Sequence, residues 1–354
     1  MVARKKIRSA LSSLARNSTV VSYESRAHFK ARILRRKKIV GRALRLLPTS
    51  KHFSTRVSVF LRRYNCRARF FMTWLSALDA FGSREVFALE GLFKSHPIAC
   101  LIIVSSSMDS DKGKHILNPF LDKGYRVMAC KPDFDYLFEN TPADSWFKKF
   151  KKGKINPGMV PLGQNLSNLL RLALLYKFGG IYLDTDVLVL KSLHHLRNAV
   201  GAQTMDLETG LWSRLNNAVL IFDKNHPLLL KFIREFALTF DGNKWGHNGP
   251  YLVSRVVSRF LGKPELDNVT VLPPSAFYPV NWSRVQSIFK RPTSELHSKR
   301  QEKMLKQIKD KSFAIHFWNK HSKNIEIEGG SIVDRIMLEY CLLCSSANST
   351  LISE

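Results

Sequence analysis

Residues 164–190 read QNLSNLLRLALLYKFGGIYLDTDVLVL, and this order predicts a helix, a glycine stop and a strand that ends on two carboxylates. Apolar residues recur at helical spacing and predict one buried face: Leu166, Leu169, Leu170 and Ala173. Gly179 and Gly180 suit the C-terminus of the helix, because glycine adopts a left-handed backbone at little cost. Residues 181–183 then predict a short buried strand that leads directly into Asp184-Thr185-Asp186.

Three polar side chains share another face of the same predicted helix. Asn165, Asn168 and Arg171 follow one another at intervals of three residues, so we expect a row of donors that points away from the core. Tyr182 is expected in the core, on the opposite face of the strand from Asp184. The helix would therefore bring polar groups to the strand end, where α/β sheets bind ligands.

The two carboxylates at the strand end predict a metal site. In an extended backbone, residues i and i+2 face the same side, so Asp184 and Asp186 would point together. Two neighbouring anions repel unless a cation or protons join them. Oxygen ligands with open positions suit Mg²⁺ or Mn²⁺ shared with substrate phosphates. An acidic turn without a metal is the alternative, and the position at the end of an apolar strand favours the metal.

The D-T-D segment resembles the D-x-D region of the alpha-1,4-glycosyltransferase family, which includes the lactosylceramide alpha-galactosyltransferases. Further blocks of this resemblance follow in family order: RFFMTW at 69–74, LNNAVL at 215–220, WGHNGP at 245–250, LPPSAFYP at 272–279 and HFWNK at 316–320. The likeness covers roughly residues 64–341. It implies a retaining, metal-dependent transferase that moves a hexose from a nucleotide sugar, a UDP-sugar by family likeness, to a glycan or glycolipid hydroxyl with an alpha linkage.

The resemblance also implies an α/β fold of the GT-A type, with a Rossmann-like, mainly parallel sheet flanked by helices. The residue pattern agrees, since apolar strands at 69–74, 98–104 and 125–130 alternate with helices at 83–94, capped by Ser83, and 111–121. The uniformly apolar segment 98–104 predicts a central parallel strand. The lysine-rich segment 132–162 is interpreted as a solvated basic strip rather than an ordered loop beside the cleft.

The positive charge is concentrated near the N-terminus. The chain carries 56 Lys and Arg against 28 Asp and Glu, and residues 1–69 hold twenty of the basic residues with Glu24 as their one acid. We divide the chain into a basic arm (1–63), a transferase domain (64–345) and a tail (346–354). The arm has the composition of a disordered extension, a transit peptide or a nucleic-acid-binding arm. Residues 39–47 would suit an amphipathic helix on an anionic membrane.

No transmembrane helix is predicted, because the best candidate, residues 57–81, is interrupted by charged residues. A Golgi location is implied by the family resemblance. Five cysteines are too few for a disulfide scaffold. Cys100 and Cys130 are expected as buried thiols, and Cys341 and Cys344 would pair only in an oxidising compartment.

The predicted catalytic residues are Asp184, Asp186 and Asn217, and the predicted metal ligands are Asp184, Asp186 and His316. Asn217 precedes an apolar strand-like run and would hold the sugar near its reacting carbon. His316 returns late in the chain, and imidazole in the ligand set favours Mn²⁺ over Mg²⁺. A buried histidine in the sheet is the alternative for His316.

Donor binding is assigned to four residues: Trp74, Asn168, Arg171 and Trp318. Related transferases often have an aspartate where this chain has Asn168, so the sugar would be held here without that charge. Arg171 would contact the diphosphate or the sugar, and a surface cation is its alternative role. Trp74 would meet the base and ribose or belong to the core.

Acceptor binding is assigned to the 245–250 loop, through Trp245, His247 and Asn248. An indole offers a flat face to a sugar ring, and the other two residues offer hydrogen bonds. A transferase-like scaffold without activity remains an alternative function. A basic nucleic-acid-binding protein is disfavoured, because the charge excess lies mainly in one arm.

Overall fold

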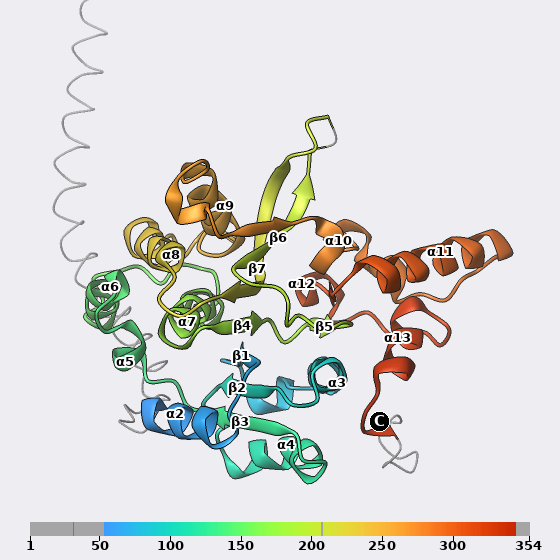
Figure 1. The fold of residues 1–354 in the computed structure, drawn as a ribbon, viewed down its shortest axis with the longest axis horizontal. Helices are drawn as coiled ribbons and strands as arrows, with labels where there is room; N and C mark the ends of the chain where they lie inside the picture. Colours follow the sequence, from blue (N-terminus) through green and yellow to red (C-terminus); the bar gives the residue numbers. More distant parts are fainter. Residues whose placement is uncertain (1–30, 32–52, 207, 345–354) are drawn as a thin grey trace, which may run out of the picture.

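The computed structural model describes residues 31, 53–206 and 208–344. The described part of the chain does not include residues 32–52 of the basic arm, which contain the segment 39–47, or the tail. Within it, a seven-stranded sheet carries helices on both faces (Figure 1). The predicted α/β class, with a mainly parallel sheet flanked by helices, is confirmed.

The strands of the main sheet lie in the order β3-β2-β1-β4-β7-β6-β8. The pairs β3–β2, β2–β1, β1–β4 and β6–β8 are parallel, whereas β7 is antiparallel to both of its neighbours. The strands are β1 (Arg69–Thr73), β2 (Cys100–Val104), β3 (Arg126–Cys130), β4 (Gly180–Leu183), β6 (Ala199–Met205), β7 (Trp212–Phe222) and β8 (Thr270–Leu272). The strands predicted at 69–74, 98–104 and 125–130 are all present.

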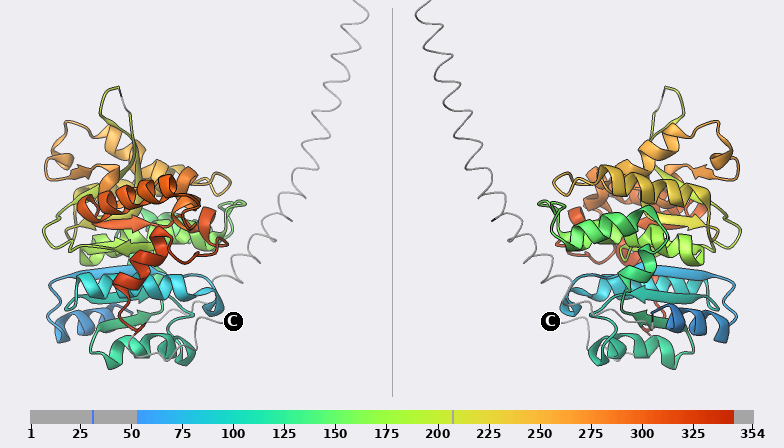
Figure 2. Two further views of the ribbon diagram at one scale, coloured as in Figure 1. Left: turned by 90° about the vertical axis from the view of Figure 1, so that its right-hand side faces the viewer. Right: turned by 90° about the vertical axis from the view of Figure 1, so that its left-hand side faces the viewer.

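Two helical layers enclose the sheet, and the side views in Figure 2 show them from opposite directions. One layer packs into a common apolar cluster and comprises α2 (Phe53–Arg63), α5 (Phe134–Phe138), α6 (Pro142–Lys151), α7 (Leu162–Phe178), α8 (Pro227–Thr239) and α9 (Pro250–Arg259). The other comprises α3 (Ser83–Ser95), α4 (Asp111–Asp122), α10 (Pro274–Phe277), η3 (Trp282–Ile288), α11 (Glu295–Lys311) and α13 (Ile332–Tyr340). The remaining described helices are short: η1 (Leu78–Ala80), η2 (Pro264–Leu266) and α12 (Asn319–Ser322).

Alternation along the strands divides the core between the two layers. Phe70 and Met72 belong to the cluster with α3 and α4, whereas Phe71 belongs to the cluster with α7 and stacks on Phe178 with ring centroids 5.8 Å apart. A strand covered by helices on both faces must be apolar at every position, and β2 is buried throughout. The apolar character predicted for 98–104 therefore reflects a central strand.

Helix α7 is buried on almost every side, so its expected polar face is enclosed by other parts of the protein. Asn165, Asn168 and Arg171 are all buried, because their side chains bond to other parts of the protein. The helix ends at Phe178, and the capping residue Gly179 has a φ of 63°. Gly180 follows with a φ of 124°, and a Cβ there would lie 2.5 Å from the carbonyl oxygen of Arg69. Both glycines are required by the turn into β4.

The folded unit begins earlier than the boundary predicted at residue 64. Phe53 and Val57 lie on one face of α2 and are buried in the cluster around α7.

The 132–162 segment also differs from the predicted solvated strip. It contains α5 and α6, and α6 buries Trp146 and Phe150 at helical spacing while its lysines face outward. An amphipathic helix explains the lysines better than a strip without structure.

The structure corrects one of the cysteine predictions. Cys100 pairs with Cys66 in a disulfide, with Cα atoms 5.7 Å apart. Cys130 is a buried free thiol, as expected, and burial raises its pKa to about 11. Cys341 and Cys344 form a second disulfide. Among the described residues, none of the helices has the length and apolar character needed to span a membrane.

A second, two-stranded sheet holds the residues that follow the D-T-D segment. It consists of β5 (Val187–Val189) and β9 (Ala314–His316), which pair antiparallel with Val187 opposite His316. Helix α3 packs on β5 through Gly91, and it begins after Gly82 rather than at a Ser83 cap. A Cβ at Gly91 would lie 2.2 Å from Cδ1 of Leu188 and 3.0 Å from the carbonyl oxygen of Val189. The glycine therefore sets how closely α3 approaches β5.

We predict that Gly91→Ala lowers the free energy of unfolding by about 1–3 kcal/mol, the usual cost of overpacking. The substitution would otherwise stabilise a helix interior by about 0.5–1 kcal/mol, so the contact with β5 decides the sign. Chemical denaturation measures the change. Gly82→Ala is the matched control, because a Cβ there meets no atom nearer than 3.7 Å. A Gly91→Ala protein as stable as the parent would contradict this account.

Candidate active site

A cavity of about 910 Å³ opens where β1 and β4 end. Its walls come from the end of β1, the first half of α7, the D-T-D turn, β7, the 245–249 loop with the start of α9, and the segment around α12. Nine of the sequence-predicted site residues line it: Trp74, Asn168, Arg171, Asp184, Asp186, Asn217, Trp245, His316 and Trp318. His247 and Asn248 are not among the lining residues. The fold thus brings most of the predicted site to one place.

The D-T-D segment is a turn rather than a continued strand. The backbone N–H of Asp184 donates to Ala218 at 2.8 Å, which extends the β4–β7 pairing by one bond. The N–H of Val187 donates back to the carbonyl of Asp184 at 3.1 Å and closes the turn. The two carboxylates therefore lie close together because the chain turns between β4 and β5, and not because of strand alternation.

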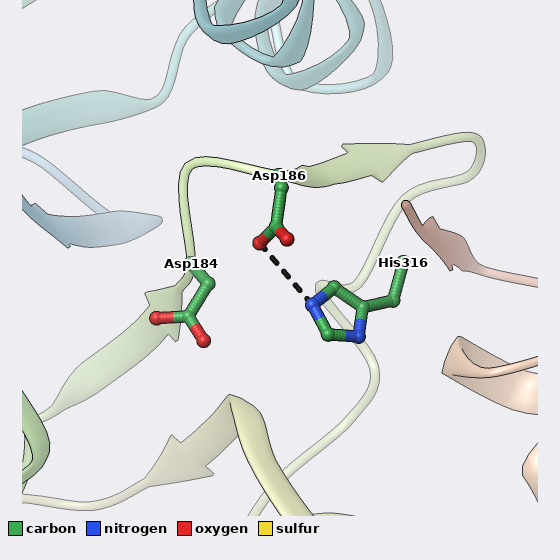
Figure 3. Close-up of side chains that lie close together, drawn as sticks. All are labelled: Asp184, Asp186 and His316. Atoms are coloured by element: carbon green, nitrogen blue, oxygen red, sulfur yellow. Dashed lines mark ion pairs between the residues drawn. The ribbon is translucent and has the colours of Figure 1, made fainter. Parts of the chain in front are cut away.

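His316 completes a cluster with the two aspartates (Figure 3). Its Nε2 lies 3.2 Å from Oδ1 of Asp186, and one ligand atom from each of the three residues lies within 4.8 Å of the others. The β5–β9 pairing sets this position, because it puts His316 opposite the residue after Asp186. The backbone N–H of Phe317 donates to the carbonyl oxygen of Asp186 at 2.9 Å, and the N–H of Asn319 donates to its carboxylate at 2.8 Å.

The cluster fits a hard or borderline divalent cation. It offers two carboxylates and an imidazole, a mixed set that suits Mn²⁺. The Nδ1 atom of His316 is buried and has no hydrogen-bond partner within the described residues. Together with the open cavity beside the carboxylates, these donors meet the chemical needs of a metal that shares its shell with a substrate.

Arg171 is bound to Asp184 and does not project freely into the cavity. Its guanidinium lies 3.0 and 3.2 Å from the two carboxylate oxygens and donates to the carbonyl of Asn217 at 2.7 Å. Tyr182 lies on the same side as Asp184, contrary to prediction, and its hydroxyl donates to Oδ1 at 2.8 Å. The guanidinium also packs over the phenol ring of Tyr182, with the Cζ atom of Arg171 4.5 Å from the ring centroid. Asp184 is thus held from two directions.

The two carboxyl groups differ in proton affinity. Burial raises the pKa of Asp184, Asp186 adds to the rise, and the pull of Arg171 offsets it only in part. Burial also acts to raise the pKa of Asp186, but His316 and the backbone N–H groups of Asn319 and of Asp186 itself outweigh it, so this pKa lies below its ordinary value. Asp186 is therefore the more firmly ionised member of the pair.

Buried amides form the floor of the cavity. Asn217 donates from Nδ2 to Oδ1 of Asn168 at 2.9 Å, and Asn216 donates to Oε1 of Gln203 at 2.9 Å. Asn216 and Asn217 lie inside β7 and not before a strand, since β7 begins at Trp212. This part of the cavity is neutral and rich in hydrogen-bonding groups, which suits the hydroxyls of a sugar.

The 241–250 loop divides its predicted residues between two tasks. Asn248 donates to Oδ1 of Asn165 and to the carbonyl of Asp241, and His247 contacts the carbonyl of Thr239 through Nε2 at 2.8 Å. Their side chains bond within the protein, so the geometry favours a role in shaping the loop over contact with an acceptor. Trp245 lines the cavity, is 46% exposed and has the Nζ of Lys320 3.8 Å from its ring centroid.

The two other predicted tryptophans are nearly buried in the cavity wall. Trp74 donates from Nε1 to the carbonyl of Ala77 at 3.0 Å, and Trp318 donates to the carbonyl of Val280 at 2.8 Å. Trp318 has a left-handed backbone, with a φ of 55°. A bulky residue is rarely found there, and such strain is concentrated at functional sites.

Several lining residues carry no motif that sequence reasoning could have recognised. They are Glu85, Gln203, Arg214, Tyr251, Trp282 and Lys323. Glu85 accepts from the N–H of Gly82 and from Nδ2 of Asn319, so it supports the segment that contacts Asp186. These residues come from helices and strands whose place beside the cavity depends on the tertiary fold. The lysine of the HFWNK block, Lys320, was visible in the sequence but received no role.

Comparisons with known proteins show the family to which this chain belongs. The alpha 1,4-glycosyltransferase conserved region matches residues 221–348, and the glycosyltransferase sugar-binding region containing a DXD motif matches residues 82–206. The chain is 32% identical to lactosylceramide 4-alpha-galactosyltransferase of Rattus norvegicus over 269 residues, which are 72% of this chain and 68% of that protein.

Two further relatives extend the comparison. An uncharacterized protein of Arabidopsis thaliana is 35% identical over 304 residues, 84% of this chain, and the chain spans only 45% of that protein's length. The human alpha-1,4-N-acetylglucosaminyltransferase is 23% identical over 236 residues, 63% of this chain and 62% of that protein. From the family regions and the rat relative, the chain belongs to the alpha-1,4-glycosyltransferase family, and the predicted glycosyltransferase is confirmed.

Proposed function

We propose that the protein is a retaining, Mn²⁺-dependent hexosyltransferase that uses a UDP-sugar and forms an alpha linkage to a glycan or glycolipid hydroxyl. The cluster of Asp184, Asp186 and His316 at the cavity wall carries the proposal. A galactosyl and an N-acetylglucosaminyl donor are the two choices that the names of the relatives suggest. Mg²⁺ is the alternative cation, and the imidazole favours Mn²⁺.

The donor would lie between the metal cluster and the amide floor. Asp184, Asp186 and His316 would hold the metal, which when bound supplies positive charge to the leaving diphosphate. Lys320 and Lys323 line the adjacent wall and would add charge for the same phosphates. Asn168 and Asn217 would bind sugar hydroxyls. Trp74 and Trp318 would border the nucleoside, and Arg171 would act by fixing the carboxylate of Asp184.

A retaining transfer can use either a carboxylate nucleophile or a front-face displacement. The described carboxylates of the cavity all have other partners, which supports the front-face displacement. Among the described lining residues they are Glu85, Asp184 and Asp186. Glu85 is occupied by the Gly82 N–H and Asn319, and the two aspartates belong to the metal cluster. The acceptor oxygen would bond to the anomeric carbon on the face that the diphosphate leaves, and the hydroxyl proton would pass to the departing phosphate oxygen. Retention follows, and NMR of the product's anomeric proton tests it.

The acceptor would enter at the mouth of the cavity. Trp245, Tyr251 and Trp282 line it and keep 46%, 39% and 42% of their surface exposed. Exposed aromatic faces at a cavity mouth suit the apolar faces of sugar rings.

For the cellular location, we propose the Golgi lumen, because the disulfides Cys66–Cys100 and Cys341–Cys344 fit an oxidising compartment.

The first test is thermal stabilisation of the full chain by UDP-galactose and UDP-N-acetylglucosamine, with and without Mn²⁺. A ligand that binds only the folded state must raise the melting temperature. We expect a rise that needs Mn²⁺ and that Asp186→Asn removes, because one ligand is lost. Asp206→Asn, an exposed aspartate in a turn, is the control. A donor response that is the same with and without Mn²⁺ would overturn the metal assignment.

The metal response should depend on pH. Ligand carboxylates must be deprotonated to hold a cation, and the pKa of Asp184 lies above its ordinary value. On acidification, Asp184 gains its proton earlier than a free carboxyl would. The Mn²⁺-dependent stabilisation should therefore fall on acidification before the ordinary carboxyl range is reached. Melting curves with and without Mn²⁺ across the pH range measure this, and a response that persists into that range would refute it.

Replacing Arg171 should damage both stability and metal binding. Lysine cannot reproduce the planar fork that bonds Asp184, Asn217 and Ser167 together, so Arg171→Lys should lower the free energy of unfolding by about 2–4 kcal/mol. Denaturation measures it, and a Mn²⁺ titration should show weaker binding. The control is Arg197→Lys, whose exposed pair with Asp223 should contribute less than about 1 kcal/mol. Equal effects at both positions would contradict the role assigned to Arg171.

A further inference from the structure

Arg214 is a cation on the cavity wall for which the donor chemistry has no use. It lies near the start of β7, and its guanidinium sits 4.7 Å from the centroid of the Tyr251 ring. Both residues line the cavity. No carboxylate within the described residues forms an ion pair with Arg214, and none accepts a hydrogen bond from it. Its five N–H donors are therefore available to a ligand.

The distance along β7 separates Arg214 from the proposed diphosphate site. Ala218 bonds to Asp184 and marks the metal end of the strand, and Arg214 lies four residues before it. At the rise of an extended strand this is about 13 Å. The Tyr251 ring in α9 keeps the guanidinium at that end, beside the loop that carries Trp245. Arg214 thus faces the part of the cavity assigned to the acceptor.

The carboxylates of the cavity lie at the opposite end from Arg214. Glu85, Asp184 and Asp186 all gather at the metal end, where Glu85 contacts Asn319 and Asn319 contacts Asp186. At the other end the neutral Gln203–Asn216 pair lies on the pocket side of β6 and β7. Helix α9 also begins there, and helix N-termini carry partial positive charge. The acceptor end is therefore electropositive, without a carboxylate of its own among the described lining residues.

We propose that the acceptor carries an anionic group, a carboxylate or a phosphate. Arg214 would bind this group while the exposed rings of Trp245, Tyr251 and Trp282 hold the sugar. This inference rests on the proposed function and names the class of its acceptor. A neutral sugar would leave the guanidinium donors unused, whereas a carboxylate or phosphate matches their forked geometry. Tyr251 would hold the arginine in place for that contact.

Matched probes that differ only in the group at C6 of the sugar, which is neutral or anionic, test the proposal. Phenyl β-galactoside is compared with phenyl β-galacturonide, and with the galactoside 6-phosphate, by tryptophan fluorescence titration in the presence of UDP and Mn²⁺. Trp245 and Trp282 at the mouth supply the signal. We expect at least one anionic probe to bind about tenfold more tightly than the neutral one, as a charged hydrogen bond allows. The stronger of the two anionic arms identifies the group.

The variants separate binding from structure. Arg214→Gln should abolish the preference while binding of the neutral probe stays within about twofold, and Arg214→Lys should keep part of it. Arg63→Gln is the matched control, because Arg63 also packs on a tyrosine but lies on α2 away from the cavity. Four outcomes would each overturn the inference. The parent protein could bind all probes equally or bind none, and Arg214→Gln could leave the preference intact or weaken the binding of every probe equally.

Melting curves with UDP and Mn²⁺ on the same samples distinguish two kinds of failure. A normal Mn²⁺-dependent response without any anion preference rejects the acceptor class alone. If UDP and Mn²⁺ do not raise the melting temperature of the parent protein, the proposed function is rejected, whatever the probes show.

Discussion

The buried contact between Arg171 and Asp184 is the interaction on which the site depends. Arg171 is only 1% exposed, and its guanidinium joins α7, the end of β4 and the carbonyl of Asn217 in β7. A charge so buried is tolerated only with a partner and satisfied donors. The pairing therefore fixes the helix, two strands and the first metal-site carboxylate relative to one another. Asp186 and His316 are then added by the turn and by the β5–β9 sheet.

Local signals explain which parts of this fold were predictable. The α7–β4 unit was recognised because helical spacing, Gly179 and the apolar strand are neighbours in sequence. The N-terminal boundary and α6 were missed, since the burial of Phe53 and Trp146 depends on partners far along the chain. The Cys66–Cys100 pair was missed for the same reason.

The site shows the same division. Motif blocks led to the metal cluster and to Trp245, but the shape of the D-T-D turn needed β7 and β9. His247 and Asn248 looked like ligand contacts because their polar side chains occur in a glycine-rich loop, whereas the structure uses them within the protein. Arg214 carried no recognisable signal, since an arginine in a strand reveals its surroundings only after Tyr251 is placed beside it.

The β5–β9 sheet has a consequence for biogenesis. Asp186 and Asn319 are 133 residues apart in sequence, and His316 reaches the aspartates only through this same long-range pairing. Closing such a loop costs entropy before any contact forms. During synthesis the aspartates emerge well before the histidine, so the complete cation site cannot form until almost the whole domain has been made. A chain truncated before β9 would keep its D-T-D segment but lack an assembled metal centre.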